Sequence, residues 1–392
     1  MTSEWNHSTI NDVCVLVTDG SHSSPKSVND GKYMVSVKDF TDYGFDFASC
    51  RMISNDDYET LKRNGCVPQM DDILIGKDGA RFFEDIIIYR QKEKPALLSS
   101  IAILRCDKSK ILPDFLYYVL RTPSFRQDVK DNYGSGSAIP RIILKDFKRM
   151  MVSYPSLEKQ QSIISVLTAI DSKIQANTEI NDNLQQQAAA LFSSLYDRTN
   201  TEVRFTDLIQ ILGGGTPKTG ENTYWNGNIA FFTPKDVGTP YTLSTEKTIT
   251  EEGLSHCNSR LYPVNTVFVT ARGTVGKVGM SGVPMAMNQS CYALVGKETH
   301  QLLVYFYTLK TVDRLKHKAS GAVFDAITTR DFESEQIMKL SDEDAKSFLC
   351  IAAPMFQKVL DNGIENQRLS TLRDSLLPKL MSGEIDVSAV QL

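Results

Sequence analysis

The chain has 392 residues, a hydrophobic fraction of 41% and a formal net charge of −4. These values are typical of a soluble protein with two to four structural units, and they exclude a protein that coats DNA through an overall positive charge. No stretch approaches the roughly 18 apolar residues of a membrane span. Seven scattered cysteines and five histidines indicate neither a disulfide framework nor a metal site. We therefore expect a cytoplasmic protein without membrane association.

Residues 1–156 are predicted to form a mixed α/β globule. DGSHSSP at 19–25 is a turn signal, and the apolar spacing of 113–131 is typical of one helix. Alternating apolar runs predict strands at DILIG (72–76), DIIIY (85–89) and IAILRC (101–106).

Residues 157–198 are predicted to form a long helix that pairs with another. Apolar or small residues recur with the alternating spacing of four and three that defines a coiled-coil seam. Asn177 and Asn181 occupy the two remaining seam positions. The other seam residues are Ile163, Leu167, Ile170, Ile174, Leu184, Ala188, Leu191 and Leu195.

Residues 199–341 are predicted to form a second globule that repeats the first. TVFVTAR (266–272) and CYALVG (291–296) read as strands, and 301–318 reads as a helix. Three pairs of segments match between the globules: ILIGKDG (73–79) with VFVTARG (267–273), LLSSIAIL (97–104) with MNQSCYAL (287–294), and GSGSAIPRIILKDF (134–147) with ASGAVFDAITTRDF (319–332).

Residues 342–392 repeat the seam 185 positions later, from Phe348 to Leu380, with Asn362 and Asn366 at the two asparagine positions. Proline lacks the amide that a helix interior needs. The sequence therefore predicts that the second long helix begins near Pro354 and that residues 342–352 form a separate short helix. The seam from Met355 to Leu376 is about 33 Å long at 1.5 Å per residue.

The two long helices are expected to run antiparallel. If the second globule returns its chain near the point where it received it, the second helix begins at the far end of the first. This arrangement places Asn177 opposite Asn366 and Asn181 opposite Asn362. A buried seam asparagine costs stability but fixes register when another polar group faces it. The alternative is that these asparagines lie at the edge of the seam and are solvated.

The sequence contains no recognisable catalytic constellation. None of its 14 prolines is adjacent to another, so the (N/D/S)-P-P-(Y/F/W) loop of a DNA amino-methyltransferase is missing. The GxxxxGK(S/T) phosphate loop, HExxH and GxSxG are also missing. The glycines of ARGTVGKVG (271–279) do not have the spacing of the phosphate loop. We expect no catalytic residue and no metal ligand in this chain.

Two globules, each followed by a long helix, resemble the specificity subunit of a type I restriction–modification system. TDGSHSSP and GGGTPKTGENTYW resemble the openings of its target-recognition domains. YPSLEKQQSIISVLTAIDSKI resembles its central shared region, and RLSTLRDSLLPKLMSGEI the C-terminal one. The resemblance covers essentially the whole chain. SDEDAKSFLCIAAP departs from it, because the Leu157-Glu158-Lys159-Gln160 motif is not repeated there.

The resemblance implies an α+β fold with two pseudo-repeated target-recognition domains separated by a long antiparallel two-helix coiled coil. It implies a non-catalytic subunit that reads a bipartite double-stranded DNA target, each globule reading one half. Two methyltransferase subunits would dock on it with S-adenosylmethionine, and restriction subunits would add ATP- and Mg-dependent chemistry. The helix pair would set the gap, since about 33 Å is close to one B-DNA turn of about 34 Å.

Two other classes of protein compete with this interpretation. One is a stand-alone restriction or methylation enzyme, against which the missing motifs argue. The other is a coiled-coil adaptor with duplicated ligand-binding domains and no role on DNA.

Polar and basic residues on the glycine-rich loops are the candidates for DNA contact. Cations there can bind phosphates, and arginine can pair with guanine O6 and N7. For each residue alone, ordinary surface charge is the competing interpretation. The candidates are Ser21, His22, Lys26, Lys77 and Arg81 in the first globule, and Lys218, Lys235, Arg272 and Lys277 in the second.

Overall fold

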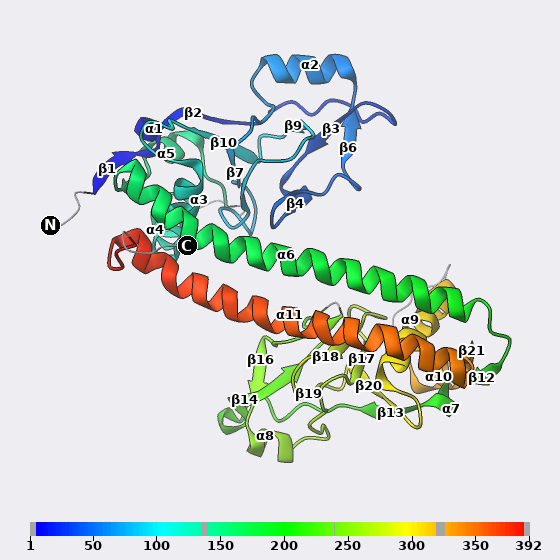
Figure 1. Ribbon diagram of the computed structural model, residues 1–392. Coiled ribbons are helices and arrows are strands. Elements are labelled where there is room, and N and C mark those ends of the chain that lie inside the picture. The colour runs from blue at the N-terminus through cyan, green and yellow to red at the C-terminus, as the bar shows by residue number, and fades with distance from the viewer. Residues whose placement is uncertain (1–4, 135–139, 239, 319–325, 388–392) are drawn as a thin grey trace. The chain divides into compact units, whose positions relative to one another are not determined.

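The computed structural model divides into two compact units, each of which contains one globule and a part of each long helix (Figure 1). Unit 1 combines residues 1–172 with residues 369–392, and unit 2 is formed by residues 173–368. The structure describes residues 5–134, 140–238, 240–318 and 326–387.

The main sheet of unit 1 has four antiparallel strands in the order β2 (Cys14–Asp19), β10 (Ile101–Cys106), β7 (Ile73–Gly76) and β8 (Ile86–Ile88). The three strands predicted in this globule are thereby confirmed. Both faces of β7 are buried: Ile73 and Ile75 belong to one apolar cluster and Leu74 to another. A continuous run of β-branched and leucine side chains suits such a strand.

Smaller elements surround this sheet. Three short sheets pair β1 (Asn6–Thr9) with β11 (Met151–Tyr154), β3 (Lys32–Val35) with β6 (Arg51–Ile53) and β9 (Ala96–Leu97), and β4 (Phe40–Thr41) with β5 (Gly44–Phe45). The helices of this globule are α1 (Ile10–Val13), α2 (Asn55–Arg63), α3 (Pro113–Arg121), α4 (Pro123–Asn132) and α5 (Leu144–Arg149).

The prediction of a single helix over 113–131 is wrong, because α3 and α4 are separated at Thr122. Pro123 has no amide proton and disfavours the helical conformation of the residue before it. Thr122 is accordingly extended, with φ −61° and ψ 141°. Its Oγ1 accepts a hydrogen bond from the Phe125 amide at 3.3 Å and so caps the new helix.

Unit 2 repeats this plan with altered loops. Its main sheet has the order β13 (Ile209–Gly213), β20 (Cys291–Gly296), β17 (Val267–Thr270), β18 (Val278–Ser281) and β15 (Tyr241–Thr242). The smaller sheets join β16 (Lys247–Ile249), β14 (Trp225–Phe232) and β19 (Met285–Met287), and pair β12 (Glu202–Arg204) with β21 (Gln336–Met338). Its helices are α7 (Phe205–Leu208), α8 (Glu251–Ser255), α9 (Gln301–Lys318) and α10 (Thr329–Ser334).

The duplication is visible element by element. Helix α10 lies 185 residues after α5, and β21 pairs with β12 as β11 pairs with β1. The strands predicted at 266–272 and 291–296 and the helix predicted at 301–318 are confirmed. Residues 135–139 and 319–325, which belong to the longest pair of matching segments, lie outside the described residues.

The long helices α6 (Leu157–Tyr196) and α11 (Asp342–Ser382) pack against each other and run antiparallel (Figure 1). In unit 1 the Arg373 guanidinium lies 2.8 Å from the Asp171 carboxylate, and in unit 2 Lys173 lies 3.5 Å from Glu365. Every predicted seam position from Ile163 to Leu195 is buried or half-buried, as is every matching position from Phe348 to Leu380. The predicted fold class is confirmed.

The predicted helix start near Pro354 is wrong, because α11 is continuous from Asp342 through the proline. Phe348, Ala352 and Phe356 lie on both sides of Pro354 and are at most 3% exposed. Burying two phenylalanines contributes about 3–6 kcal/mol, which offsets the roughly 3 kcal/mol cost of an interior proline. The overlooked start signal is Ser341, whose Oγ accepts a hydrogen bond from the Asp344 amide at 3.1 Å.

Within the described part of the chain, no helix is long and apolar enough to cross a membrane. The domain limits after residues 156, 198 and 341 stay a prediction, because the two compact units cut across the long helices instead.

Candidate nucleic-acid interface

Each repeat carries a loop at the end of its first sheet strand that only glycine allows. A Cβ atom on Gly20 would lie 2.3 Å from the Leu97 carbonyl oxygen, and one on Gly214 would lie 2.2 Å from that of Asn288. The next residue is bonded in the same way in both repeats, since the Ser21 amide donates to Leu97 O at 2.7 Å and the Gly215 amide donates to Met287 O at 3.0 Å. We call residues 20–26 and 214–218 the glycine loops.

A second loop in each repeat follows strand β7 or β17. The amides of Lys77 and Ala271 donate to Ser100 O and Ser290 O, at 2.9 and 2.8 Å. Their carbonyl oxygens each accept a hydrogen bond at 3.0 Å, from the Ile142 and Ile327 amides. Two residues further, Gly79 and Gly273 have φ values of +93° and +82°, which favour glycine. We call residues 77–81 and 271–277 the turn loops.

The two kinds of loop lie at the same sheet edge. Strands β2 and β7 are each antiparallel to β10 and are therefore parallel to each other, so their C-terminal ends meet. The turn before β10 joins them, because the Ser99 amide donates to Ser21 O at 2.9 Å while Ser100 O holds Lys77. Strands β13 and β17 are likewise each antiparallel to β20, so both repeats place their two loops at one sheet edge, where the side chains can differ.

In the first repeat the scaffold carries a buried ion pair under an exposed histidine. The Lys77 ammonium lies 3.2 Å from Asp19 Oδ2, with 1% and 8% of the two side chains exposed. The other carboxylate oxygen lies 3.3 Å from Nε2 of His22, whose side chain is 69% exposed. Lys77 therefore does not fit the prediction of a surface phosphate ligand, because its charge is neutralised inside the globule.

In the second repeat the same positions carry different groups. Gly213 and Ala271 stand where the first repeat has Asp19 and Lys77, so the second repeat has no ion pair there. The counterpart of His22 is Thr216, whose hydroxyl donates to Gln289 Oε1. Arg272 is exposed where the first repeat has Asp78, a carboxylate 3.3 Å from Arg141. The second turn loop therefore offers more positive charge than the first.

The remaining predicted contacts are mostly surface residues. Lys26, Lys218 and Lys277 are exposed, and Lys235 is 81% exposed with its ammonium 3.8 Å from Glu246. Arg81 is 72% exposed and lies 2.7 Å from Asp85. The hydrogen bond that Arg81 donates to the Asp85 carboxylate raises the pKa of Arg81.

Ser21 lies inside instead of facing solvent. Its side chain is 5% exposed and its hydroxyl donates to the Ser23 carbonyl at 2.8 Å. Ser21 thus shapes the glycine loop and is withdrawn from direct contact with a ligand.

Two residues that hold the first glycine loop were overlooked in the sequence. Besides Asp19, Arg51 donates to the Pro25 carbonyl at 2.9 Å and to Ser24 Oγ at 2.8 Å. The sequence did contain a signal for Asp19. When Gly20 is aligned with Gly214, Asp19 matches Gly213 and Lys77 matches Ala271, so both charges are absent from the second repeat together. No sequence pattern connects Arg51 to residues 24–25.

The four seam asparagines pair as the antiparallel arrangement requires. Asn177 Nδ2 donates to Asn366 Oδ1 at 2.9 Å, and Asn362 Nδ2 donates to Asn181 Oδ1 at 2.8 Å. Asn177 and Asn362 are at most 1% exposed. Asn177 also donates to Glu365 at 2.8 Å, and this hydrogen bond lowers the pKa of the Glu365 carboxyl. Their role in fixing register stays a prediction.

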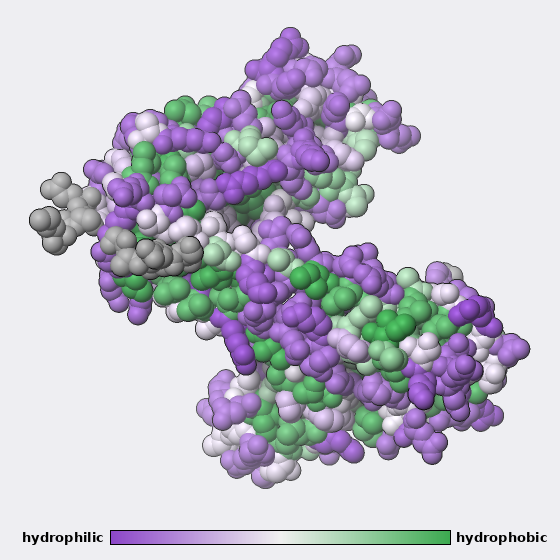
Figure 2. Space-filling model, viewed as in Figure 1, coloured by the Kyte–Doolittle hydropathy of each residue, from purple (hydrophilic) through white to green (hydrophobic). Residues whose placement is uncertain are grey.

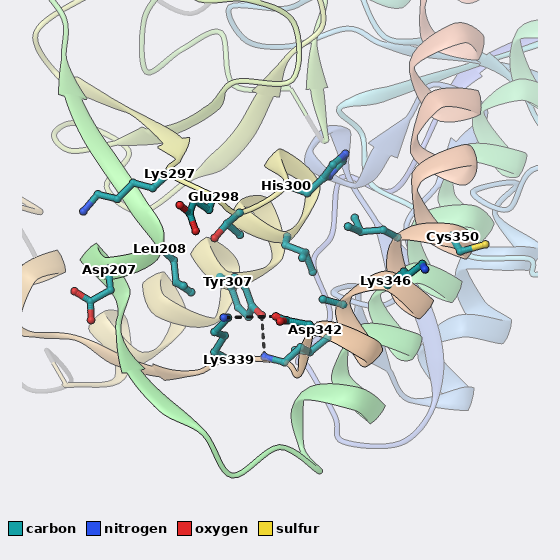
Figure 3. Close-up of a pocket in the computed structure, with 15 residues that line it drawn as sticks. Asp207, Leu208, Lys297, Glu298, His300, Tyr307, Lys339, Asp342, Lys346 and Cys350 are labelled. Atoms are coloured by element: carbon teal, nitrogen blue, oxygen red, sulfur yellow. Dashed lines mark hydrogen bonds and ion pairs between the residues drawn. The ribbon is translucent and has the colours of Figure 1, made fainter.

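A cavity of about 1050 Å³ opens in unit 2 where α11 begins (Figure 3). The matching place in unit 1 is filled by Gln160, which is fully buried. Its carboxamide accepts from the Leu112 amide at 2.9 Å and donates to Lys110 O at 2.9 Å and Pro155 O at 3.0 Å. At the offset of 185, the counterparts of Gln160 and Pro155 are Ala345 and Leu340, and both line the cavity. The second repeat thus has an open space beside the alanine that replaces the glutamine.

Comparison with known proteins gives a consistent result. The family description "Type I restriction modification DNA specificity domain" matches residues 2–186 and 198–341. The specificity subunit of the type I restriction enzyme HindI from Haemophilus influenzae is 23% identical over 368 residues, covering 72% of this chain and 80% of the relative. That of the enzyme MjaIX from Methanocaldococcus jannaschii is 23% identical over 307 residues, covering 71% of each chain.

The fold has a counterpart of known structure. The crystal structure of the S subunit of a type I restriction–modification system from M. genitalium superimposes with a TM-score of 0.59 at 16% sequence identity. The match covers 97% of this chain and 96% of that one.

Proposed function

Because the chain belongs to the family of type I restriction–modification DNA specificity domains, we propose that it is the subunit that reads the DNA sequence for such a system. Each repeat reads one half of a bipartite double-stranded target. The chain supplies recognition, and the chemistry on DNA belongs to partner subunits.

The observation that carries this proposal is the duplicated loop scaffold with divergent side chains. Ser21 and Gly215, which follow the two close-packed glycines, are held by equivalent backbone bonds, as are Lys77 and Ala271. The side chains that follow differ in charge and hydrogen-bonding capacity. A protein that reads two unlike half-sites needs two similar frames carrying unlike side chains, because base edges are distinguished by donors, acceptors and methyl groups.

The proposal includes partners. Two methyltransferase subunits bring S-adenosylmethionine, and restriction subunits bring ATP and Mg. On the helix pair, Ile180 of α6 and Ile351 and Leu372 of α11 are 44–47% exposed. The hydrophobic residues visible in Figure 2 lie in separate patches among hydrophilic ones. Apolar residues that are exposed singly are ordinary on a protein surface, so the support for these partners is the family match.

The adaptor alternative, with duplicated ligand domains and no role on DNA, is disfavoured by the family match over both repeats. Mobility shift of genomic DNA fragments, with and without a methyltransferase subunit of the same system, distinguishes the two. Sequence-dependent retention supports the recognition subunit. The absence of any retention on DNA in the assembled complex contradicts it.

The decisive experiment on function is sequencing of methylated bases in a host with and without this chain. The proposal predicts one bipartite motif that is modified only when the chain is present. Modification that is independent of the chain contradicts the proposal.

A further inference from the structure

The buried ion pair of the first repeat has its outer end at the surface of the glycine loop. Lys77 Nζ contacts Asp19 Oδ2 at 3.2 Å, and Asp19 Oδ1 contacts His22 Nε2 at 3.3 Å. The only other carboxylate that the structure places near this ammonium, among the described residues, is Asp78 at 3.9 Å. The three side chains form a line from the interior of the globule to a ring that is 69% exposed.

Burying two charges is costly, so such a pair needs a reason to persist. The second repeat shows that the fold does not need it, because Gly213 and Ala271 occupy both positions and keep the same backbone bonds. Both members of the pair are replaced together, and so is the residue they support, since Thr216 stands in place of His22. The Asp19–Lys77 ion pair therefore occurs together with His22, and its role is specific to the first repeat.

The chemistry of the pair sets the tautomer of the ring. A carboxylate only accepts hydrogen bonds, so His22 Nε2 must carry the proton that points to Asp19. In the neutral ring, Nδ1 is then an acceptor. No hydrogen bond of Nδ1 with the described residues is formed, and the ring is largely exposed, so this acceptor is available to a ligand.

We propose that His22, held by Asp19 and Lys77, reads a base with an exocyclic amine in the first half-site. An acceptor in the major groove pairs with a donor, and the donors there are the N6 amine of adenine and the N4 amine of cytosine. His22 is the reading residue, and Asp19 and Lys77 are positioning residues. This inference rests on the proposed function and concerns one base position of one half-site.

The test uses the assembled methyltransferase complex and DNA duplexes in which each base pair of the first half-site is replaced in turn. Asp19→Asn is the informative variant. The Lys77 ammonium only donates, so it attracts the carboxamide oxygen and leaves the amide NH₂ facing His22. In this variant Nε2 of His22 accepts a hydrogen bond from the introduced amide, so Nδ1 carries the proton and becomes a donor to the DNA base. A donor pairs with guanine N7 or O6, thymine O4 or adenine N7 and with no group of cytosine, so the affinity for guanine or thymine relative to cytosine at that position is expected to rise by roughly 5- to 150-fold.

Two further variants make the outcome independent of how well Asp19→Asn folds. His22→Ala alters an exposed side chain, and the double variant Asp19→Gly with Lys77→Ala copies the second repeat. Both are expected to remove the preference at the same single position. Preference in the second half-site, which the second repeat reads, is the internal control and stays unchanged.

An unchanged first half-site preference in His22→Ala and in the double variant overturns this inference while leaving the proposed function intact. A loss of preference spread over several positions also overturns it, because it indicates only a structural role for the ion pair. If the wild-type complex shows no bipartite preference at all, the proposed function itself fails.

Discussion

Arg272 is an exposed cation of the second turn loop, as is Lys277, and it lies beside a glycine with φ +82°. If it reads a base, Arg272→Ala should cost roughly 1–3 kcal/mol of binding free energy and relax the second half-site alone. If it binds phosphate, binding should weaken equally on all sequences and the salt slope should fall by about one. Salt titrations of the complex on matched and mismatched duplexes separate the two. Wild-type affinity and preference for Arg272→Ala and Lys277→Ala alike would remove this loop from the interface.

Asn177 and Asn362 are buried at seam positions that usually hold apolar residues. Replacing Asn177 and Asn181 by leucine removes the donor to Asn366 Oδ1 and the acceptor of Asn362 Nδ2, so we expect a loss of about 1–3 kcal/mol per orphaned group. Replacing all four should restore stability but loosen register. Thermal unfolding by circular dichroism measures both. Asn183→Leu, at an exposed position of α6, is the control, and equal melting temperatures for the half-substituted variant and wild type would contradict the pairing argument.

The two long helices begin in different ways. Gln160, near the start of α6, forms three hydrogen bonds with backbone groups. Ala345, at the matching position of α11, lines an open cavity. Gln160→Ala should therefore destabilise the protein by about 1–3 kcal/mol. Ala345→Gln introduces the residue of the first repeat at a position that lines the cavity, and it should raise the melting temperature because the longer side chain fills part of the open space. A decrease for Ala345→Gln would show that the two helix starts are not equivalent.

Pro354 lies inside α11 and leaves the Cys350 carbonyl without its helical donor. Pro354→Ala should increase the free energy of unfolding, by up to about 3 kcal/mol. Denaturant titration followed by helical circular dichroism measures the gain. Ser347→Ala on the same helix controls for helix propensity alone. A destabilised Pro354→Ala would mean that the proline is needed for the packing of Phe348 and Phe356.

These helices also show where sequence reasoning reached its limit. The 4-3 spacing fixed the seam correctly over its whole length, because periodicity reports which face is buried. The proline rule failed at Pro354, since aromatic packing on both sides outweighed a local cost. At Pro123 the proline rule holds and separates α3 from α4, although the apolar spacing of 113–131 predicts one helix. At the site, the glycine-rich turn segments located the loops, but the burial of Lys77 and Ser21 depends on neighbours distant in sequence.

In the whole molecule, the antiparallel helices connect the two target-recognition globules of one chain. If they set the gap between half-sites, lengthening both equally should lengthen the gap. One heptad inserted between residues 172 and 173 and another between 368 and 369 preserves the seam and adds about 10.5 Å. The number of unspecified base pairs should then rise by up to about three, with both half-sites unchanged. Methylated motifs that keep the original gap would contradict this role.

Sequencing of methylated bases tests most directly whether each repeat reads its own half-site. The hosts express the wild-type chain, His22→Ala or Arg272→Ala with the same methyltransferase subunit. Wild type should give one bipartite motif. His22→Ala should relax one half of that motif and leave the other unchanged, and Arg272→Ala, if it reads a base, should relax only the opposite half. A motif in which His22→Ala alters both halves, or in which both variants alter the same half, would contradict the claim that each repeat reads its own half-site.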